Sequence, residues 1–115
     1  MGTWKILVQD KAASELDGLP LDIQARFQRL FELVEELGKA ALTMPHARHI
    51  QGPLWELRAR GRDGIARGLY VVVIPDKVLV VRFFVKKTQK TPIQEIRLAL
   101  RRFKEYEDDR SKEDS

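Results

Sequence analysis

The sequence predicts an α+β domain, in which a twisted antiparallel sheet of about four strands carries helices on one face. Short apolar or alternating segments, typical of strands, occur at the N-terminus and three times between residues 54 and 85. Helical spacing of apolar residues both precedes and follows that run of three segments. With 115 residues the chain has room for one domain and one core, so these elements must pack together.

The N-terminal third is expected to hold one strand and two helices. Residues 4–9 are apolar and partly β-branched, which favours a first strand. Residues 10–16 suit a brief helix that ends at Gly18. Pro20 is tolerated in the first turn of a longer helix, and Gly38 is a natural stop. The apolar residues of this longer helix recur at spacings of three and four: Ile23, Phe27, Leu30, Phe31, Val34 and Leu37.

Residues 41–53 contain several breakers and are expected to form a connecting loop. The chain after this loop predicts an antiparallel meander, with turn residues between successive strands. The expected strands are 54–60, 65–74 and 78–85, and the expected turns are 61–64 and 75–77. A last helix is expected from Thr91, the N-cap, with Pro92 in its first turn and Gln94 completing a capping box.

Strand alternation decides which side chains share a face of the sheet. If helices cover the side that carries Trp55 and Leu57, the opposite face is open and basic, and Phe84 lies among its cations, able to stack on a nucleobase. The cations expected there are Arg58, Arg60, Arg67, Arg82 and Lys86, with Lys87 and Lys90 in the following loop. The alternative is that these arginines pair with Glu56 or with the acidic helix and serve only the fold.

The charge of the chain is unevenly distributed. Residues 48–104 carry 14 Lys and Arg against 4 Asp and Glu, whereas residues 105–115 carry 2 against 6. A segment as basic as 48–104 points to a polyanionic partner, RNA or DNA by default, although surface solvation alone is the simpler alternative. We expect one domain over residues 1–106 and a disordered acidic tail over residues 107–115.

Several function classes are excluded or disfavoured. No apolar run is long enough to span a membrane, and the N-terminus lacks the cleavage site of a secretory signal. The absence of cysteine excludes disulfides and thiolate chemistry, and fits a cytoplasmic protein. His46 and His49 have incomplete metal spacing and are expected to be exposed loop residues rather than an acid–base pair. No cofactor or metal is expected.

Three segments in order resemble the RelE/HigB-like toxins, especially the phage-derived branch of the RelE/ParE superfamily. They are GPLWELR at 52–58, ARGLY at 66–70 and FFVKKTQKTP at 83–92. The resemblance runs from the first strand to about Tyr106 and agrees with the α+β prediction. It implies the toxin of a bacterial type II toxin–antitoxin system, an mRNA interferase that enters the ribosome and cuts mRNA during translation. The implied partners are the ribosome, mRNA and a helix-turn-helix antitoxin, and the free toxin is expected to be monomeric.

The resemblance also implies the residues of the site. Arg67 matches the family's sheet arginine at the scissile phosphate, Arg58 a basic position on the neighbouring strand, and Lys87 a basic residue after the last strand. The implied reaction is metal-independent, because the RNA 2′-OH is the nucleophile; the enzyme must align it, move a proton and stabilise charge on phosphorus. Arginine suits bidentate phosphate contact, and Lys86 or Lys87, crowded by cations, suits a base or acid of lowered pKa.

One feature departs from the family pattern. Several RelE proteins carry a catalytic tyrosine just after the basic loop, where this chain has Ile93. Tyr70 is expected to be a packing residue and Tyr106 lies at the far end of the last helix, so the proton donor is open. Two other functions remain open as well: a ParE-like inhibitor of DNA gyrase, which shares the fold, and a nucleic-acid-binding module without catalysis.

Overall fold

The protein is described by a computed structural model that covers residues 4–43, 46–73 and 75–114. The elements follow one another as β1 (Lys5–Val8), α1 (Asp10–Asp17), α2 (Leu21–Leu37), the 3-10 helix η1 (Gly38–Ala41), β2 (Ala47–Gln51), β3 (Leu54–Gly61), β4 (Gly64–Val73), β5 (Lys77–Val85) and α3 (Ile93–Asp114). The predicted α+β class is confirmed, and so are the meander and the three helices. The strand expected over residues 65–74 is β4, described as far as Val73, and residue 74 lies outside the described residues.

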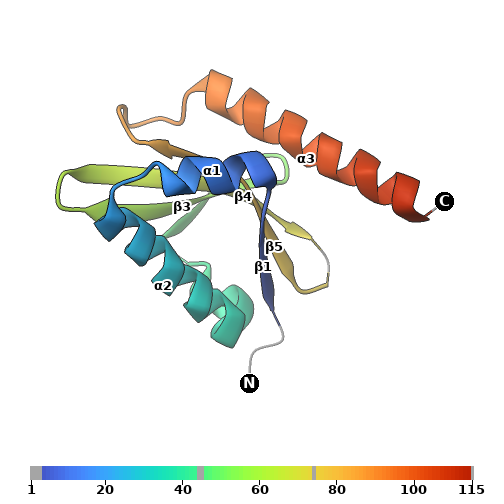
Figure 1. Cartoon of the computed structure of the whole chain (residues 1–115), viewed down its shortest axis with the longest axis horizontal. Helices are drawn as coiled ribbons and strands as arrows, with labels where there is room; N and C mark the ends of the chain where they lie inside the picture. The colour runs from blue at the N-terminus through green and yellow to red at the C-terminus, as the bar shows by residue number, and fades with distance from the viewer. Residues whose placement is uncertain (1–3, 44–45, 74, 115) are drawn as a thin grey trace.

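The sheet is mixed and has five strands, in the order β1-β5-β4-β3-β2 (Figure 1). Strands β2 to β5 are antiparallel, while β1 pairs in parallel with β5 at one edge. The prediction of about four antiparallel strands missed β2, which lies within the expected loop 41–53. Its sequence, Ala47–Gln51, is short and mostly polar, so it has no apolar alternation that marks a strand on its own.

The first face of the sheet packs against α2. Phe27 and Phe31 of α2 meet Phe83 of β5, with the Phe27 and Phe83 rings edge to face and their centroids 5.0 Å apart. Gly68 of β4 makes room for this contact, because a Cβ there would lie 3.1 Å from the Phe83 ring. Tyr70 is fully buried in the same core, as expected of a packing residue.

The second face is half covered by α3, so the expectation that helices lie on one face only is wrong. In Figure 1 the sheet lies between α2 and α3. Ala99 of α3 packs on a second core formed by Leu54, Leu69, Val71, Leu79 and Val81. A β-bulge between Leu69 and Tyr70 shifts the register of β4 against β5 and turns Leu79 and Val81 toward α3, which simple alternation from Phe83 does not predict. The half of this face near the β3–β4 turn is not covered by a helix.

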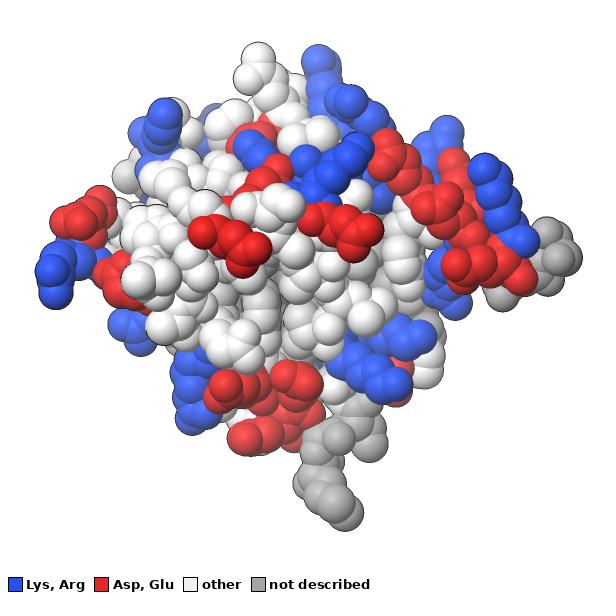
Figure 2. Space-filling model, viewed as in Figure 1, with Lys and Arg blue, Asp and Glu red and all other residues white. Residues whose placement is uncertain are grey.

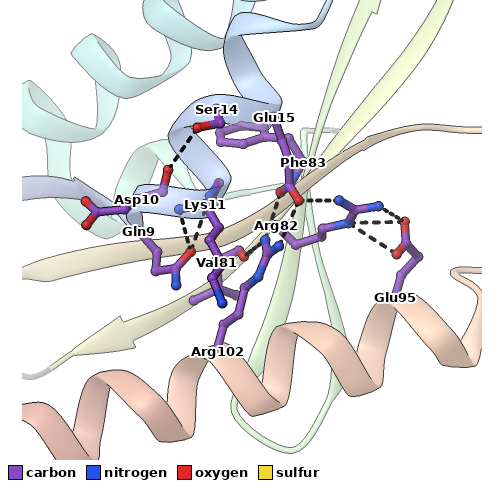
Figure 3. Close-up of polar contacts among 11 residues, drawn as sticks. Gln9, Asp10, Lys11, Ser14, Glu15, Val81, Arg82, Phe83, Glu95 and Arg102 are labelled. Carbon is purple, nitrogen blue, oxygen red and sulfur yellow. Dashed lines mark hydrogen bonds and ion pairs between the residues drawn. The ribbon is translucent and has the colours of Figure 1, made fainter.

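A network of ion pairs ties α1 and α3 to β5 (Figure 3). Arg102 of α3 donates to both oxygens of Glu15 on α1, at 2.9 Å each, and to the carbonyl of Val81. Arg82 of β5 pairs with the same Glu15 and, at 2.9 Å, with Glu95 of α3. Burial alone raises the pKa of Glu15, but hydrogen bonds from Arg102, the Phe83 N–H and Arg82 outweigh it and hold that pKa below its usual value.

Helix α3 continues to Asp114, so residues 107–114, expected to be disordered, are helical. No proline or glycine follows Pro92, and contacts one turn apart support the helix: the Arg110 guanidinium lies 5.7 Å from the centroid of the Tyr106 ring. This end of α3 projects past the sheet, and acidic side chains gather on it (Figures 1 and 2). Within the described part of the chain, no helix is long and apolar enough to cross a membrane.

Replacing Glu15 by Gln is expected to lower the free energy of unfolding at neutral pH by on the order of 2 kcal/mol, because two arginines lose their shared carboxylate. The folded-state pKa of Glu15 lies below its ordinary value of 4.5, so its contribution is present above that pH and is lost as the pH falls through the folded pKa. Urea unfolding of wild type and Glu15→Gln from neutral to acid pH measures this. The difference in unfolding free energy between wild type and Glu15→Gln should disappear on acidification, and Glu36→Gln, which alters an exposed carboxylate, should show no such difference. A difference that does not depend on pH contradicts the stabilising role of the Glu15 carboxylate.

Candidate functional site

A buried ion pair lies beneath the uncovered half of the second face. Glu56 of β3 and Arg67 of β4 are both 0% exposed, and Arg67 Nη1 lies 3.3 Å from Glu56 Oε2. Thr91, just before α3, joins them: its hydroxyl donates to Glu56 at 2.7 Å and accepts from Arg67 at 2.8 Å. A buried charge is tolerated only when it is paired and hydrogen-bonded, and Thr91 supplies these hydrogen bonds to Glu56 Oε2 and Arg67 Nη1, while Glu56 Oε1 and Arg67 Nε have no hydrogen bond among the described residues.

Arg67 also fixes the loop between β5 and α3. Its Nη2 donates to the carbonyl oxygens of Thr88, at 3.1 Å, and Gln89, at 2.7 Å. The loop backbone therefore depends on one guanidinium. Thr91 was expected to cap α3, but its hydroxyl is used by the ion pair, and the helix begins at Ile93 with the carbonyl of Pro92 accepting its first hydrogen bonds.

The predicted role of Arg67 at the scissile phosphate does not fit this placement, because the side chain is buried and its guanidinium is occupied by protein acceptors. Burial lowers the pKa of Arg67, and the carboxylate of Glu56 opposes that effect. Sequence alternation put Arg67 on the correct face. The alternation could not show that loop 86–91 folds over that face and accepts hydrogen bonds from the Arg67 guanidinium.

Three cations remain accessible around the buried pair. Arg58 is opposite Arg67 in register, 28% exposed, with its Nε 3.5 Å from Glu56 Oε1. Arg48 of β2 is opposite Glu56, and Lys86 follows β5, with its N–H bonded to the Ile65 carbonyl at 2.7 Å. We call Arg48, Arg58 and Lys86 the basic site.

The electrostatics of the basic site affect its lysine. Desolvation lowers the pKa of Lys86, and the positive charges of Arg58, Arg67 and Arg48 lower it further, against an opposing effect of Glu56. The carboxylate oxygen Glu56 Oε1 and the nitrogen Arg58 Nε are buried without a hydrogen-bond partner among the described residues. A site of this kind can hold a phosphate beside an amine that loses its proton more easily than an ordinary lysine.

The other predicted cations are distributed unevenly. Lys87 and Lys90 are exposed in the loop, as expected, and Lys86 and Lys87 line a cavity of about 400 Å³ together with Ile65. Arg60 is exposed near the end of β3. Arg82 is not part of the basic site, because Glu15 and Glu95 neutralise it.

Phe84 lies opposite Arg67 on the predicted face, but it is only partly exposed. It packs against the core beneath α3, and the Arg82 guanidinium lies 5.9 Å from its ring centroid. Its expected stacking on a nucleobase therefore conflicts with its packing role. Tyr106 belongs to the same core near the other end of α3 and is remote from the basic site.

The two histidines are exposed, as predicted, but His49 lies in β2 rather than in a loop. Its Nε2 is 2.8 Å from the carbonyl oxygen of Gly52, and its ring meets Trp55 edge to face. His46 precedes β2 and lines a cavity beside Arg58. Among the described residues, no three His, Asp or Glu side chains are grouped so as to hold a metal ion. Sequence reasoning missed Arg48 and Thr91, because their roles depend on contacts across the sheet.

The site lies within the part of the chain that matches a known family. Residues 14–104 match the family described as phage derived protein Gp49-like (DUF891). The chain belongs to this Gp49-like family. The predicted membership of the phage-derived branch is thereby confirmed. No curated protein matches the sequence.

Two solved structures similar to this Gp49-like protein contain RelE. A mutant of the E. coli toxin RelE in the free state has a TM-score of 0.62 and 14% sequence identity, over 89% of this chain and 98% of that one. An archaeal RelE–RelB complex from Pyrococcus horikoshii has a TM-score of 0.49 and 20% identity, over 72% of this chain and 94% of that one. The similarity to the E. coli toxin shows that the fold is RelE-like.

Breaking the buried pair on one side should cost more than removing both partners. Glu56→Met leaves Arg67 buried without its carboxylate and is expected to lower the free energy of unfolding by about 3–5 kcal/mol. Glu56→Met with Arg67→Met should lose less than the sum of the two single variants. Urea unfolding of the four proteins measures the coupling. The exposed variant Arg62→Met serves as control, and strictly additive losses contradict a coupled pair.

Proposed function

We propose that this Gp49-like protein is the toxin of a bacterial type II toxin–antitoxin system and cuts mRNA on the ribosome. The observation that carries the proposal is the basic site: Arg48, Arg58 and Lys86 lie on the uncovered half of a RelE-like sheet, over a buried Glu56–Arg67 pair. Such a concentration of cations suits a phosphodiester, and the mixed arginine and lysine content suits catalysis beyond binding.

The proposed reaction needs no metal. The RNA 2′-oxygen attacks the adjacent phosphorus, the bond to the 5′-oxygen breaks, and the products carry a 2′,3′-cyclic phosphate and a 5′-hydroxyl. Lys86, in its neutral form, accepts the 2′-OH proton, since its neighbours already lower its pKa. Arg58 contacts the non-bridging phosphate oxygens, where negative charge builds in the transition state. The leaving 5′-oxygen takes its proton from water.

Arg67 has a different role in this proposal from the one implied by the family resemblance. It is a positioning residue that holds Glu56 and the loop carbonyls, and thereby places Lys86 and Lys87 at the edge of the site. Lys87, Lys90 and Arg60 are exposed and contribute contacts to the RNA backbone. These contacts add affinity without sequence preference.

A helix-turn-helix antitoxin is the proposed inhibitor, acting in the cytoplasm where the ribosome is. The basic site is the obvious surface to silence, because an acidic antitoxin segment over it blocks the phosphate contacts directly. The free toxin is proposed to be monomeric.

Primer extension on a defined mRNA in a reconstituted translation reaction tests the activity. Wild type should create new 5′ ends in the coding region only when ribosomes are present. Arg58→Gln and Lys86→Gln should each lower the cleavage rate by about 100-fold, the usual scale for losing a catalytic hydrogen bond or proton acceptor. Arg62→Gln, which removes an exposed cation from the β3–β4 turn, should cleave as wild type does.

Intact mRNA in that reaction, despite growth arrest in cells, contradicts the proposal, and a gyrase supercoiling assay then tests the ParE-like function. Cleavage without ribosomes keeps the nuclease and removes the ribosome dependence. Full activity in folded Arg58→Gln and Lys86→Gln proteins places the site elsewhere.

The cleavage rate should depend on pH through Lys86. A general base acts in its neutral form, so the rate should rise as the pH rises through the lowered pKa of Lys86 and level off above it. Arg58→Gln removes a positive charge that lowers this pKa, so the rising limb should move to higher pH, apart from the drop in rate. Single-turnover rates measured across pH give this rising limb for wild type and for Arg58→Gln. An unshifted limb in Arg58→Gln, or an unchanged profile in Lys86→Gln, contradicts the role of Lys86.

A further inference from the structure

The outer edge of β3 carries a second group of cations, which adjoins the basic site at Arg58. A cavity of about 340 Å³ lies there, lined by Arg26, His46, Arg58, Arg60 and Ile65. β2 pairs with β3 only as far as Leu57, where Ala47 is its partner, and the Arg58 N–H then bonds to the His46 carbonyl at 2.8 Å. Among the described residues no strand pairs with β3 beyond that point, and Arg26 of α2 lines the cavity there.

Two cations of this cavity, Arg26 and Arg60, have no ion-pair partner among the described residues, whereas Arg58 lies beside Glu56. In the described part of the chain Arg26 and Arg60 are exposed and make no ion pair, and no carboxylate is among the lining residues. Arg29, on the same helix as Arg26, differs in this respect, because it pairs with Glu32 at 3.5 Å. Arg26 of α2, Arg58 and Arg60 of β3 and the His46 imidazole, with no carboxylate lining the cavity itself, form a site for a phosphate group.

The cavity is continuous with the basic site. Arg58 lines the cavity and also lies beside Glu56, so one guanidinium belongs to both. Ile65 lines this cavity and also the cavity of Lys86 and Lys87. Cations therefore lie on both sides of Ile65, in the loop after β5 and at the edge of β3 next to α2.

We propose that the cavity binds a phosphate of the same RNA strand next to the one at the basic site, with Arg26, Arg60 and His46 as its contacts. This inference rests on the proposed function and gives the path of the RNA on the protein. The RNA strand passes from the loop after β5, across Arg58, to the edge of β3. Arginine contacts phosphate oxygens in pairs, and the His46 ring offers an N–H donor and a flat face for a base. The contacts act on the backbone and carry no sequence preference.

Binding of a short single-stranded RNA with methylated 2′-hydroxyls separates this proposal from catalysis, because such an RNA lacks the nucleophile. Fluorescence anisotropy gives its affinity for the full chain over a range of salt concentrations. Arg26→Gln should weaken binding and reduce the slope of log K against log salt by about 0.7, the value for one lost phosphate contact on a single strand. Arg29→Gln removes the same charge from the same helix and should leave the slope unchanged.

The length of the RNA strand distinguishes a lost phosphate contact from a general structural effect of the substitution. With a dinucleotide, which has one internucleotide phosphate, Arg58→Gln should still weaken binding and Arg26→Gln should not. If Arg26→Gln and His46→Gln match Arg29→Gln on the longer strand while Arg58→Gln weakens it, this inference is overturned and the proposed function stands. If the wild type shows no salt-dependent binding and Arg58→Gln has no effect, the proposed function itself fails.

Discussion

The buried pair of Glu56 and Arg67 is the constraint on which the rest of the site depends. Two charges without solvent exposure are tolerated only when they are paired and hydrogen-bonded, and the protein supplies hydrogen bonds to the pair from Thr91 and two loop carbonyls. The pair therefore links the middle of the sheet to the loop before α3. It sets where that loop runs, where α3 begins and where the lysines after β5 are held.

α3 has two functions in this fold. Its apolar side closes one half of the second face through Ala99, and its polar side reaches Glu15 and the Val81 carbonyl through Arg102. The other half of the face stays open because the helix starts only after the loop held by Arg67. A strongly basic surface and a packed core therefore share one side of the same sheet.

Local patterns in the sequence were enough for the elements and for part of the site. Alternation over two residues placed Arg58, Arg67 and Phe84 on one face, and this is correct because it depends only on strand geometry. Burial was not predictable in the same way. Arg67 is buried by residues more than twenty positions later in the chain, Arg82 is neutralised by carboxylates from two helices, and β2 exists only because β3 offers it an edge.

The acidic end of α3 gives the molecule a permanent dipole moment. Residues 105–115 carry 2 basic against 6 acidic residues, and this end of α3, as far as Asp114, projects on the side opposite the β3–β4 turn, near which the uncovered cations lie. In the field of a polyanion such a molecule experiences a torque as well as an attraction, so it turns its cations forward before contact. Screening limits this to about 10 Å at 0.1 M salt, so the orientation occurs in the last steps of an encounter. The association rate should therefore fall more steeply with salt than the net charge of +4 implies.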